Sequence, residues 1–314
     1  MRTDRAAPKT SLVVLVLLVH LTTIGQAQAR GRLGARGSVH QIEQKRIERL
    51  IAESGAETVA VAFCDLTTGE QFLIKPDENF HAASTMKVPV MVEVFRQARA
   101  GMLSLDDRIP LKNEFLSIVD GSRYALSPDS DSEGTLYRRI GQAETVRELL
   151  RLMIDVSSNL ATNLLIERVT PERVMETMRE IGARNIRVLR GVEDSKAFQK
   201  GLNNTTTARD LMVILRKIAE RHAVSTRDSD EMIEVMLGQK FNEGIPAGLP
   251  KDVRVAHKTG SITGINHDAA IVYPPGRKPY VLVILTRGLA DENKAQTLIK
   301  EISREVYRGM THKK

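Results

Sequence analysis

Stretches with the pattern of β-strands lie near both ends of this chain, and helix-like stretches fill the region between them. Near the start, TVAVAFCDL and QFLI flank the turn TTGE; near the end, HDAAIVYP and PYVLVILTRG flank the turn PPGRK. Apolar, β-branched runs bounded by turn residues are typical of buried strands. The pattern therefore predicts one sheet built from both chain ends, with a helical part inserted between them.

The central region carries the spacing of amphipathic helices. It contains IGQAETVRELLRLMIDVSSNLATNLLIERV, TPERVMETMREIG and TTTARDLMVILRKIAERH, while further helix-like stretches precede the first strand and close the chain. We predict an α/β (α+β) two-lobe fold in which an antiparallel sheet is flanked by helices. The α/β lobe should cover about 38–83 and 223–314, and an all-helical lobe should cover about 84–222.

The first 29 residues predict a secretory signal peptide. Three basic residues precede the short apolar run LVVLVLLVHL, and the triplet AQA at 27–29 has the small-x-small form of a cleavage site. The run is short and broken for a membrane span, with an uncleaved anchor as the alternative. We expect cleavage after Ala29 and a secreted or periplasmic domain over 30–314, without stable membrane insertion.

Charge and cysteine content exclude several other classes. The formal net charge is +7, but basic and acidic residues are interspersed and aromatic residues make up 4% of the chain. This pattern favours a solvated surface over a nucleic-acid partner. Cys64 is the single cysteine, so no internal disulfide can form, and its inward strand position predicts a core residue. His81 and His257 show no metal-ligand spacing, so we expect no metal, and we take a monomer as the default.

The stretch FHAASTMKVPVMVEVFRQA places Ser84 and Lys87 three residues apart at the start of a helix-like run. Positions three apart share a helix face, so the Lys87 amine would lie near the Ser84 hydroxyl. A serine needs a base to become a nucleophile, and a lysine can be that base only when burial or nearby positive charge lowers its pKa. A helix-capping serine followed by a surface lysine is the alternative, and this pair alone does not decide.

Two later stretches complete a set. VSSNLATNLL places Ser157 and Asn159 at a break before a helix, and HKTGS places Lys258, Thr259 and Gly260 on a strand. Each alone has an ordinary interpretation as a helix cap or a strand end. In this order, S-x-x-K, S-x-N and K-T-G resemble the motifs of class A serine β-lactamases and their penicillin-binding relatives. AGMLSLDDRI, TVRELLRLMI and AAIVYPPGRKPYVLVILT extend the resemblance over nearly all of the mature chain.

The resemblance implies a role for each motif residue in acyl transfer. Ser84 would be acylated by a lactam or a related acyl donor, with Lys87 as its base or proton relay. Ser157 would pass a proton to the leaving nitrogen. Asn159 would bind the substrate amide and steady Lys87.

The strand motif would bind the substrate. Lys258 and Thr259 would hold the substrate carboxylate, and Gly260 would let the strand approach the ligand without a side chain in the way. The backbone N–H groups of Ser84 and Ser261 would form the oxyanion hole.

The sequence departs from the family pattern at two places, in the S-x-N motif and in the segment after the K-T-G motif. Ser158 stands where the β-lactamases have an aspartate, so a structural carboxylate is missing from the motif. The segment after Lys258 is slightly shorter than usual and lacks the arginine that often assists carboxylate binding. Asn266 and His267 lie nearby, and His267 is better interpreted as a hydrogen-bonded structural residue than as a substrate ligand.

A third departure concerns the water that clears the acyl-enzyme. Class A enzymes use a glutamate in a long loop for this step, and an irregular loop runs here from Arg190 to Asn204. Glu193 falls about one position from the expected slot, and the usual downstream asparagine is not evident. It could point inward as a general base or be an exposed acid beside Asp194.

Three functions follow from these residues. We expect a secreted serine β-lactamase that hydrolyses β-lactams through a Ser84 acyl-enzyme without metal or organic cofactor. A peptidoglycan D,D-peptidase or esterase is the alternative, preferred if Glu193 does not lie over Ser84. A penicillin-sensing domain that is acylated without turnover is the third hypothesis.

Overall fold

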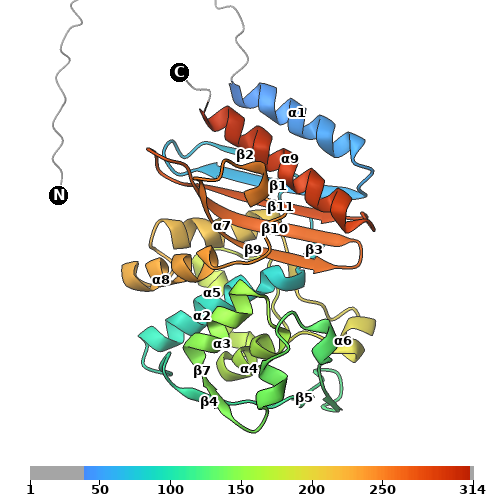
Figure 1. The fold of residues 1–314 in the computed structure, drawn as a ribbon, viewed down its shortest axis with the longest axis vertical. Helices are drawn as coiled ribbons and strands as arrows, with labels where there is room; N and C mark the ends of the chain where they lie inside the picture. Colours follow the sequence, from blue (N-terminus) through green and yellow to red (C-terminus); the bar gives the residue numbers. More distant parts are fainter. Residues whose placement is uncertain (1–38, 312–314) are drawn as a thin grey trace, which may run out of the picture. The chain divides into compact units, whose positions relative to one another are not determined.

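The computed structural model describes residues 39–311, and the surroundings of side chains from residue 44 onward. Its centre is an antiparallel sheet in the order β2-β1-β11-β10-β9 (Figure 1). The strands are β1 (Thr58–Asp65), β2 (Gln71–Ile74), β9 (Arg254–Ile262), β10 (Ile265–Tyr273) and β11 (Tyr280–Arg287). Because β1 pairs along its whole length with β11, the sheet joins both ends of the chain, which confirms the predicted fold. The predicted signal peptide and its cleavage site lie outside the described residues.

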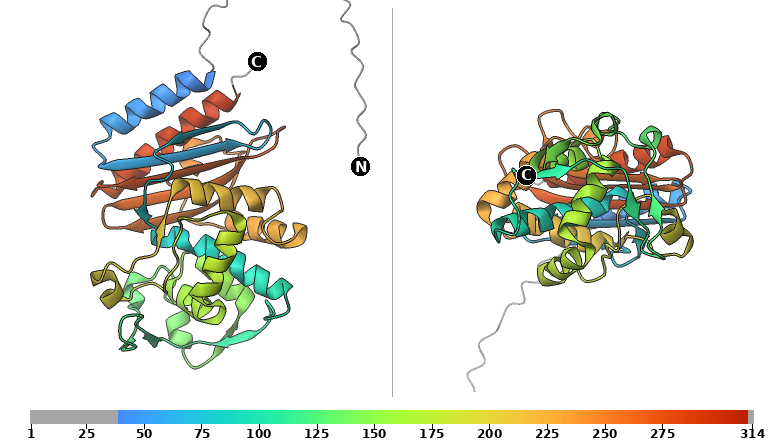
Figure 2. Two further views of the ribbon diagram at one scale, coloured as in Figure 1. Left: turned by 180° about the vertical axis from the view of Figure 1, so that it is seen from behind. Right: turned by 90° about the horizontal axis from the view of Figure 1, so that it is seen from below.

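Helices cover both faces of the sheet. α1 (Val39–Glu53) and α9 (Glu292–Thr311) lie on one face (Figure 1), while α7 (Ala208–Ala219) and α8 (Thr226–Leu237) lie on the other, as the view from behind in Figure 2 shows. Successive side chains of a strand point to opposite faces, and β1 divides accordingly between two apolar clusters. Val59, Val61 and Phe63 pack toward α1 and α9, and Ala60, Ala62 and Cys64 pack toward the opposite side. Cys64 is fully buried, which confirms its interpretation as a core residue.

A helical region lies below the sheet in Figure 1. It is formed by α2 (Lys87–Arg99), α3 (Val146–Asp155), α4 (Asn159–Val169), α5 (Pro171–Ile181) and α6 (Ser195–Gln199), with the 3-10 turns η1 (Ala83–Met86), η2 (Pro128–Ser130) and η3 (Leu136–Arg139). Helix α2 packs against α3, α4 and α5 and is buried along most of its length. Helix α2 therefore forms the centre of this region.

The helical region also contains short strands, which the sequence analysis did not expect. β4 (Arg108–Pro110) pairs with β7 (Ala143–Thr145), and β5 (Phe115–Leu116) pairs with β6 (Arg123–Tyr124). Strands this short carry no readable alternation of apolar and polar residues. A further short pair lies beside η1 and consists of β3 (Phe80–His81) and β8 (Thr205–Thr206). The 3-10 turn η4 (Pro246–Gly248) precedes β9.

Helix α7 packs against the sheet and also contacts α5 of the helical region. The sequence analysis assigned it to the helical lobe, but it packs against β1, β10 and β11. Its first turn is capped by Thr207, whose side chain accepts a hydrogen bond from Asp210 N, as expected for a threonine before a helix. The exact boundary between the lobes stays a prediction.

Candidate active site

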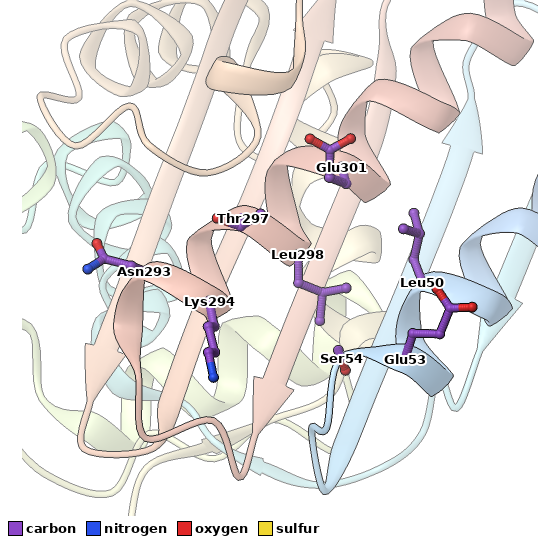
Figure 3. A pocket seen from close by; sticks show the side chains of 8 residues that line it. All are labelled: Leu50, Glu53, Ser54, Asn293, Lys294, Thr297, Leu298 and Glu301. Atoms are coloured by element: carbon purple, nitrogen blue, oxygen red, sulfur yellow. The ribbon is translucent and has the colours of Figure 1, made fainter.

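Two hollows in the described part of the chain deserve comparison as candidate sites. The larger, about 380 Å³, lies between α1 and α9 (Figure 3) and is lined by Leu50, Glu53, Ser54, Asn293, Lys294, Thr297, Leu298 and Glu301. The Ser54 hydroxyl in it donates to Ile51 O at 2.7 Å and accepts from Ala56 N at 3.1 Å, which closes the end of α1. These bonds give Ser54 a local structural role at the end of α1.

The smaller hollow, about 240 Å³, contains the motif residues. It is lined by Ser84, Ser130, Ser132, Ser157, Asn159, Phe241, Glu243, Thr259, Gly260, Ser261, Glu292 and Gln296. Lys87 and Lys258 are fully buried beside it, and each donates a hydrogen bond to Ser157, one of the lining residues. The fold thus brings three motifs that are far apart in sequence to one cavity, which we take as the candidate active site.

Gly260 sets the distance between strand β9 and the nucleophile. A Cβ atom at this position would lie 3.0 Å from Ser84 N and 3.0 Å from Thr85 N. Real Cβ atoms rarely come that close to backbone atoms, so any other residue here would push β9 and η1 apart by a few tenths of an ångström. This approach brings Ser84 and Ser261 to the same cavity.

Ser157 is the point where both lysines meet. Its Oγ accepts a hydrogen bond from Lys87 Nζ at 3.1 Å and another from Lys258 Nζ at 3.0 Å. Ser157 lies between α3 and α4 with φ = 59°, in the left-handed region that non-glycine residues rarely adopt. Such backbone conformations concentrate at functional sites, where the surrounding contacts hold them in place.

Burial of Lys87 changes its protonation. Desolvation lowers the Lys87 pKa to about 7, although the charges of Asp131 and Glu193 oppose the shift. Its ammonium donates to Ser157 O at 2.6 Å and to Asn159 Oδ1 at 3.0 Å, in addition to the Ser157 hydroxyl. The expected contact with Ser84 is not among these hydrogen bonds, because the acceptors at the start of α4 take all three donors.

Lys258 is the second buried base of the site. Burial lowers the Lys258 pKa well below its usual value, and the neighbouring charge of Lys87 lowers it further. Besides Ser157, Lys258 donates to the Thr259 carbonyl at 2.9 Å. Lys87, whose pKa burial lowers to about 7, is the amine that can act as a base near neutral pH.

Glu193 reaches the same network through Asn159. Asn159 Nδ2 donates to Glu193 Oε1 at 2.8 Å, while the other side of this amide accepts from Lys87. Glu193 also has a left-handed backbone, with φ = 63°. The adjacent Asp194 points elsewhere and caps α6 by accepting from Ala197 N at 3.0 Å. Of the two interpretations of Glu193, the inward one therefore agrees with the geometry.

The loop that carries Glu193 is closed by its own end residues. The Asn204 side chain accepts from Leu189 N at 2.8 Å and donates to Arg190 O at 2.9 Å. The buried Arg190 guanidinium donates to Leu202 O at 2.9 Å and to Asn203 Oδ1 at 3.1 Å. These bonds tie residues 189–190 to residues 202–204, so the loop holds Glu193 at a fixed place.

The carboxylate that the motif lacks at Ser158 is supplied from another segment. Asp131 Oδ2 accepts from Asn159 N at 2.9 Å, from Leu160 N at 2.8 Å and from the Ser158 hydroxyl at 3.4 Å. The motif itself lacks a carboxylate, as the sequence shows, but Asp131 brings one to this turn from outside the motif. No motif signal marked Asp131, because it lies in the irregular stretch DSDSEG, well before the S-x-N motif.

The outer part of the cavity is acidic. Glu243 and Glu292 line it from two different elements, and the Ser261 hydroxyl donates to Glu292 Oε1 at 3.2 Å. The lining contains no arginine, which agrees with the departure noted in the sequence. Both glutamates are solvent-exposed, and sequence reasoning missed them because neither belongs to a motif.

The histidines near the site have structural roles. His267 is buried, its Nε2 lies 2.9 Å from His81 O, and Thr286 N donates to its Nδ1 at 3.2 Å. Burial lowers the His267 pKa to about 4, so the ring is neutral and bonded within the sheet, as expected.

Among residues whose side chains are described, no group of three or more His, Cys, Asp or Glu could hold a metal ion. None of the helices within residues 39–311 has the length and apolarity to cross a membrane.

Comparison with known proteins identifies the family. A sequence model of the β-lactamase enzyme family matches residues 43–310. The chain belongs to this family. It is 28% identical over 265 residues to a β-lactamase of Streptomyces albus G. The match covers 83% of this chain and 81% of that relative.

Solved structures of the family share the fold. The structure of a protein named PBP-A is 27% identical, with a TM-score of 0.75, and the match covers 86% of this chain and 96% of PBP-A. A point mutant of PBP-A, solved as an acyl-enzyme complex with penicillin G, is 26% identical with a TM-score of 0.74 and coverage of 86% and 96%. An ancestral class A β-lactamase is 26% identical with a TM-score of 0.72 and coverage of 85% and 99%, so this chain has the class A β-lactamase fold.

The first prediction concerns the approach of β9 to η1. We expect Gly260→Ala to lower kcat/KM for nitrocefin by roughly 10- to 100-fold, because the new methyl group displaces the Ser84 and Thr85 backbone. Gly134→Ala is the matched control, since a Cβ there meets nothing within 4 Å. Equal activity of both variants would show that the close approach is unimportant.

The second prediction concerns the acidic outer cavity. We expect Glu292→Gln to lower KM for the anionic penicillin G by roughly twofold to fivefold, because it removes a like charge next to Ser261. Glu301→Gln on the same helix, lining the separate hollow between α1 and α9, should leave KM unchanged. Steady-state kinetics at low and high salt test this, and an unchanged KM for Glu292→Gln would contradict it.

Proposed function

We propose that this protein is a secreted serine β-lactamase that hydrolyses β-lactams through an acyl-enzyme on Ser84. One observation carries the proposal: Asn159 bonds Lys87 with one side of its amide and Glu193 with the other. That bridge joins the residue proposed to assist acylation to the residue proposed to assist hydrolysis. The leader sequence supports secretion, and the monomeric state stays a prediction.

In the proposed acylation, Ser84 Oγ attacks the lactam carbonyl carbon, and its proton passes toward neutral Lys87. The N–H groups of Ser84 and Ser261 stabilise the oxyanion. The lactam C–N bond then breaks, and the nitrogen takes a proton from Ser157 Oγ. Because Lys87 is hydrogen-bonded to Ser157 Oγ, the proton that Lys87 took from Ser84 can pass on to Ser157.

Hydrolysis of the acyl-enzyme needs an activated water. In the proposed step, Glu193 takes a proton from a water as the water oxygen attacks the ester carbonyl. The tetrahedral intermediate collapses, the ester C–O bond breaks, and the proton that Glu193 took from the water returns to Ser84 Oγ. Asn159 supports this role, since its hydrogen bond orients the Glu193 carboxylate.

Substrate binding would use the strand motif. Thr259 and Ser261 line the cavity, and Lys258 lies just beneath it. These groups would hold a substrate carboxylate, and Asn159 would bind the acyl amide. Since Lys258 has a lowered pKa and two glutamates line the outer cavity, we expect this anion clamp to be weaker than one assisted by arginine.

A D,D-peptidase or esterase of the penicillin-binding type is the second candidate. The likeness to PBP-A supports it, as does the shift of Glu193 by about one position from the family slot. Such an enzyme would form the same Ser84 adduct but lose it slowly. A penicillin-sensing domain is the third, and it would show no turnover at all.

Mass spectrometry after exposure to penicillin G separates these functions and gives the third prediction. We expect the wild type to return to its unmodified mass and Glu193→Gln to keep the adduct, because the general base is lost. Ser84→Ala should form no adduct. A lasting adduct on the wild type would favour the penicillin-binding candidates.

The fourth prediction concerns pH. If neutral Lys87 accepts the Ser84 proton, acylation must slow as pH falls through the Lys87 pKa of about 7. Single-turnover acylation of Glu193→Gln from pH 5 to 9 isolates this step. Its midpoint should lie somewhat below 7, because loss of the Glu193 charge lowers the Lys87 pKa. A rate that does not change across this range would contradict the role of Lys87.

A further inference from the structure

The loop that contains Asp131 contacts the site from outside the three motifs. Asp131 Oδ2 accepts from two successive backbone N–H groups, those of Asn159 and Leu160. The Ser158 hydroxyl already caps the next free donor, Ala161 N, at 3.2 Å. Because the first N–H groups of a helix lack internal partners, Ser158 and Asp131 together complete the N-terminus of α4.

The same loop contacts the catalytic turn and also the loop that carries Glu193. Ser132 Oγ donates to the Val156 carbonyl, immediately before Ser157. Ser130 Oγ lies 3.4 Å from Glu193 Oε1. Ser130 and Ser132 also line the cavity. A hydroxyl of Tyr137 donates to Asp131 Oδ2 at 2.9 Å and helps to fix the carboxylate.

We propose that Asp131 is a positioning residue of the reaction, whose carboxylate holds the turn bearing Ser157 and Asn159 in its catalytic conformation. This inference rests on the proposed function. Asp131 does not itself line the cavity, so it acts through the turn. The turn needs such support because Ser157 has a left-handed backbone, which the chain does not adopt without restraint.

The charge of Asp131 provides a readout that a purely structural role would not affect. Two charged groups, Asp131 and Glu193, raise the Lys87 pKa against the desolvation that lowers it. The Lys258 amine is the other basic group that binds the same Ser157 hydroxyl. Removal of the Asp131 charge should therefore lower the Lys87 pKa and shift the acylation midpoint to lower pH. A helix cap without electrostatic influence would change stability and leave this midpoint in place.

The test compares Asp131→Asn with Asp129→Asn. Asp129 is exposed in the same loop, so its substitution removes the same charge without touching the turn. We expect Asp131→Asn to slow acylation by penicillin G roughly tenfold or more and to lower the pH midpoint. Asp129→Asn should stay within about twofold of the wild type with an unchanged midpoint.

A relocation variant tests the position of the carboxylate. The double variant Asp131→Ser with Ser158→Asp returns a carboxylate to the motif position and should recover most of the lost acylation rate. Tyr137→Phe, which removes one hydrogen bond to Asp131, should give a smaller loss and covers the case in which Asp131→Asn does not fold. A wild-type rate and midpoint in folded Asp131→Asn, or in Tyr137→Phe if that variant alone folds, would overturn the proposal.

A substrate-free measurement separates this proposal from the proposed function. NMR titration of 13C-labelled lysine side chains, with Lys87→Met to assign the resonance, reports the Lys87 pKa directly. Asp131→Asn should lower this pKa and Asp129→Asn should not; equal values overturn the Asp131 proposal. Suppose that the Lys87 pKa is lower in Asp131→Asn than in the wild type, but the wild type forms no penicillin adduct. Then the proposed function fails and the electrostatic role of Asp131 stands.

Discussion

The chemistry of this site depends on two lysine side chains that are kept out of water against one serine hydroxyl. Lys87 and Lys258 are fully buried, and both donate to Ser157 Oγ. Burial disfavours the charged form of an amine, which is why Lys87 can act as a base rather than as a permanent cation. Their desolvation opposes folding, so the surrounding sheet and helices must provide the stability that the site itself does not.

Three elements hold the two lysines together. The first turn of α2 carries Lys87, the edge strand β9 carries Lys258, and the turn before α4 presents Ser157. Each contact depends on a local feature: Gly260 permits the approach of β9, and the carboxylate of Asp131 completes the start of α4. Because the site lies where sheet and helical region meet, it depends on both parts of the fold.

Much of the fold could be predicted from the sequence, because strand and helix periodicities are strong at both ends and in the middle. The motif residues also carried their own signals: Ser84 and Lys87 at a helix start, and Gly260 in a strand. Asp131 could not be found this way, since its partners lie in another segment and no spacing rule connects them.

Other features were out of reach for related reasons. Whether the Glu193 side chain points into the site depends on the hydrogen bonds that close its loop. The position of a residue along a loop sequence does not determine where its side chain points. The acidic outer cavity arises from Glu243 and Glu292, which only the folded chain brings together. The paired strands β4–β7 and β5–β6 in the helical region are too short to show an alternation of apolar and polar residues.

The pairing of β1 with β11 also governs when this protein can become active. A ribosome delivers the Ser84 segment early and the Lys258 strand late, so an unfinished polypeptide holds a nucleophile that has no complete set of partners. Contacts between distant parts of a chain form slowly, because a long loop must close first. Acyl-transfer activity should therefore emerge in one step with the docking of the last strands, and fragments that lack the carboxyl-terminal part should have none.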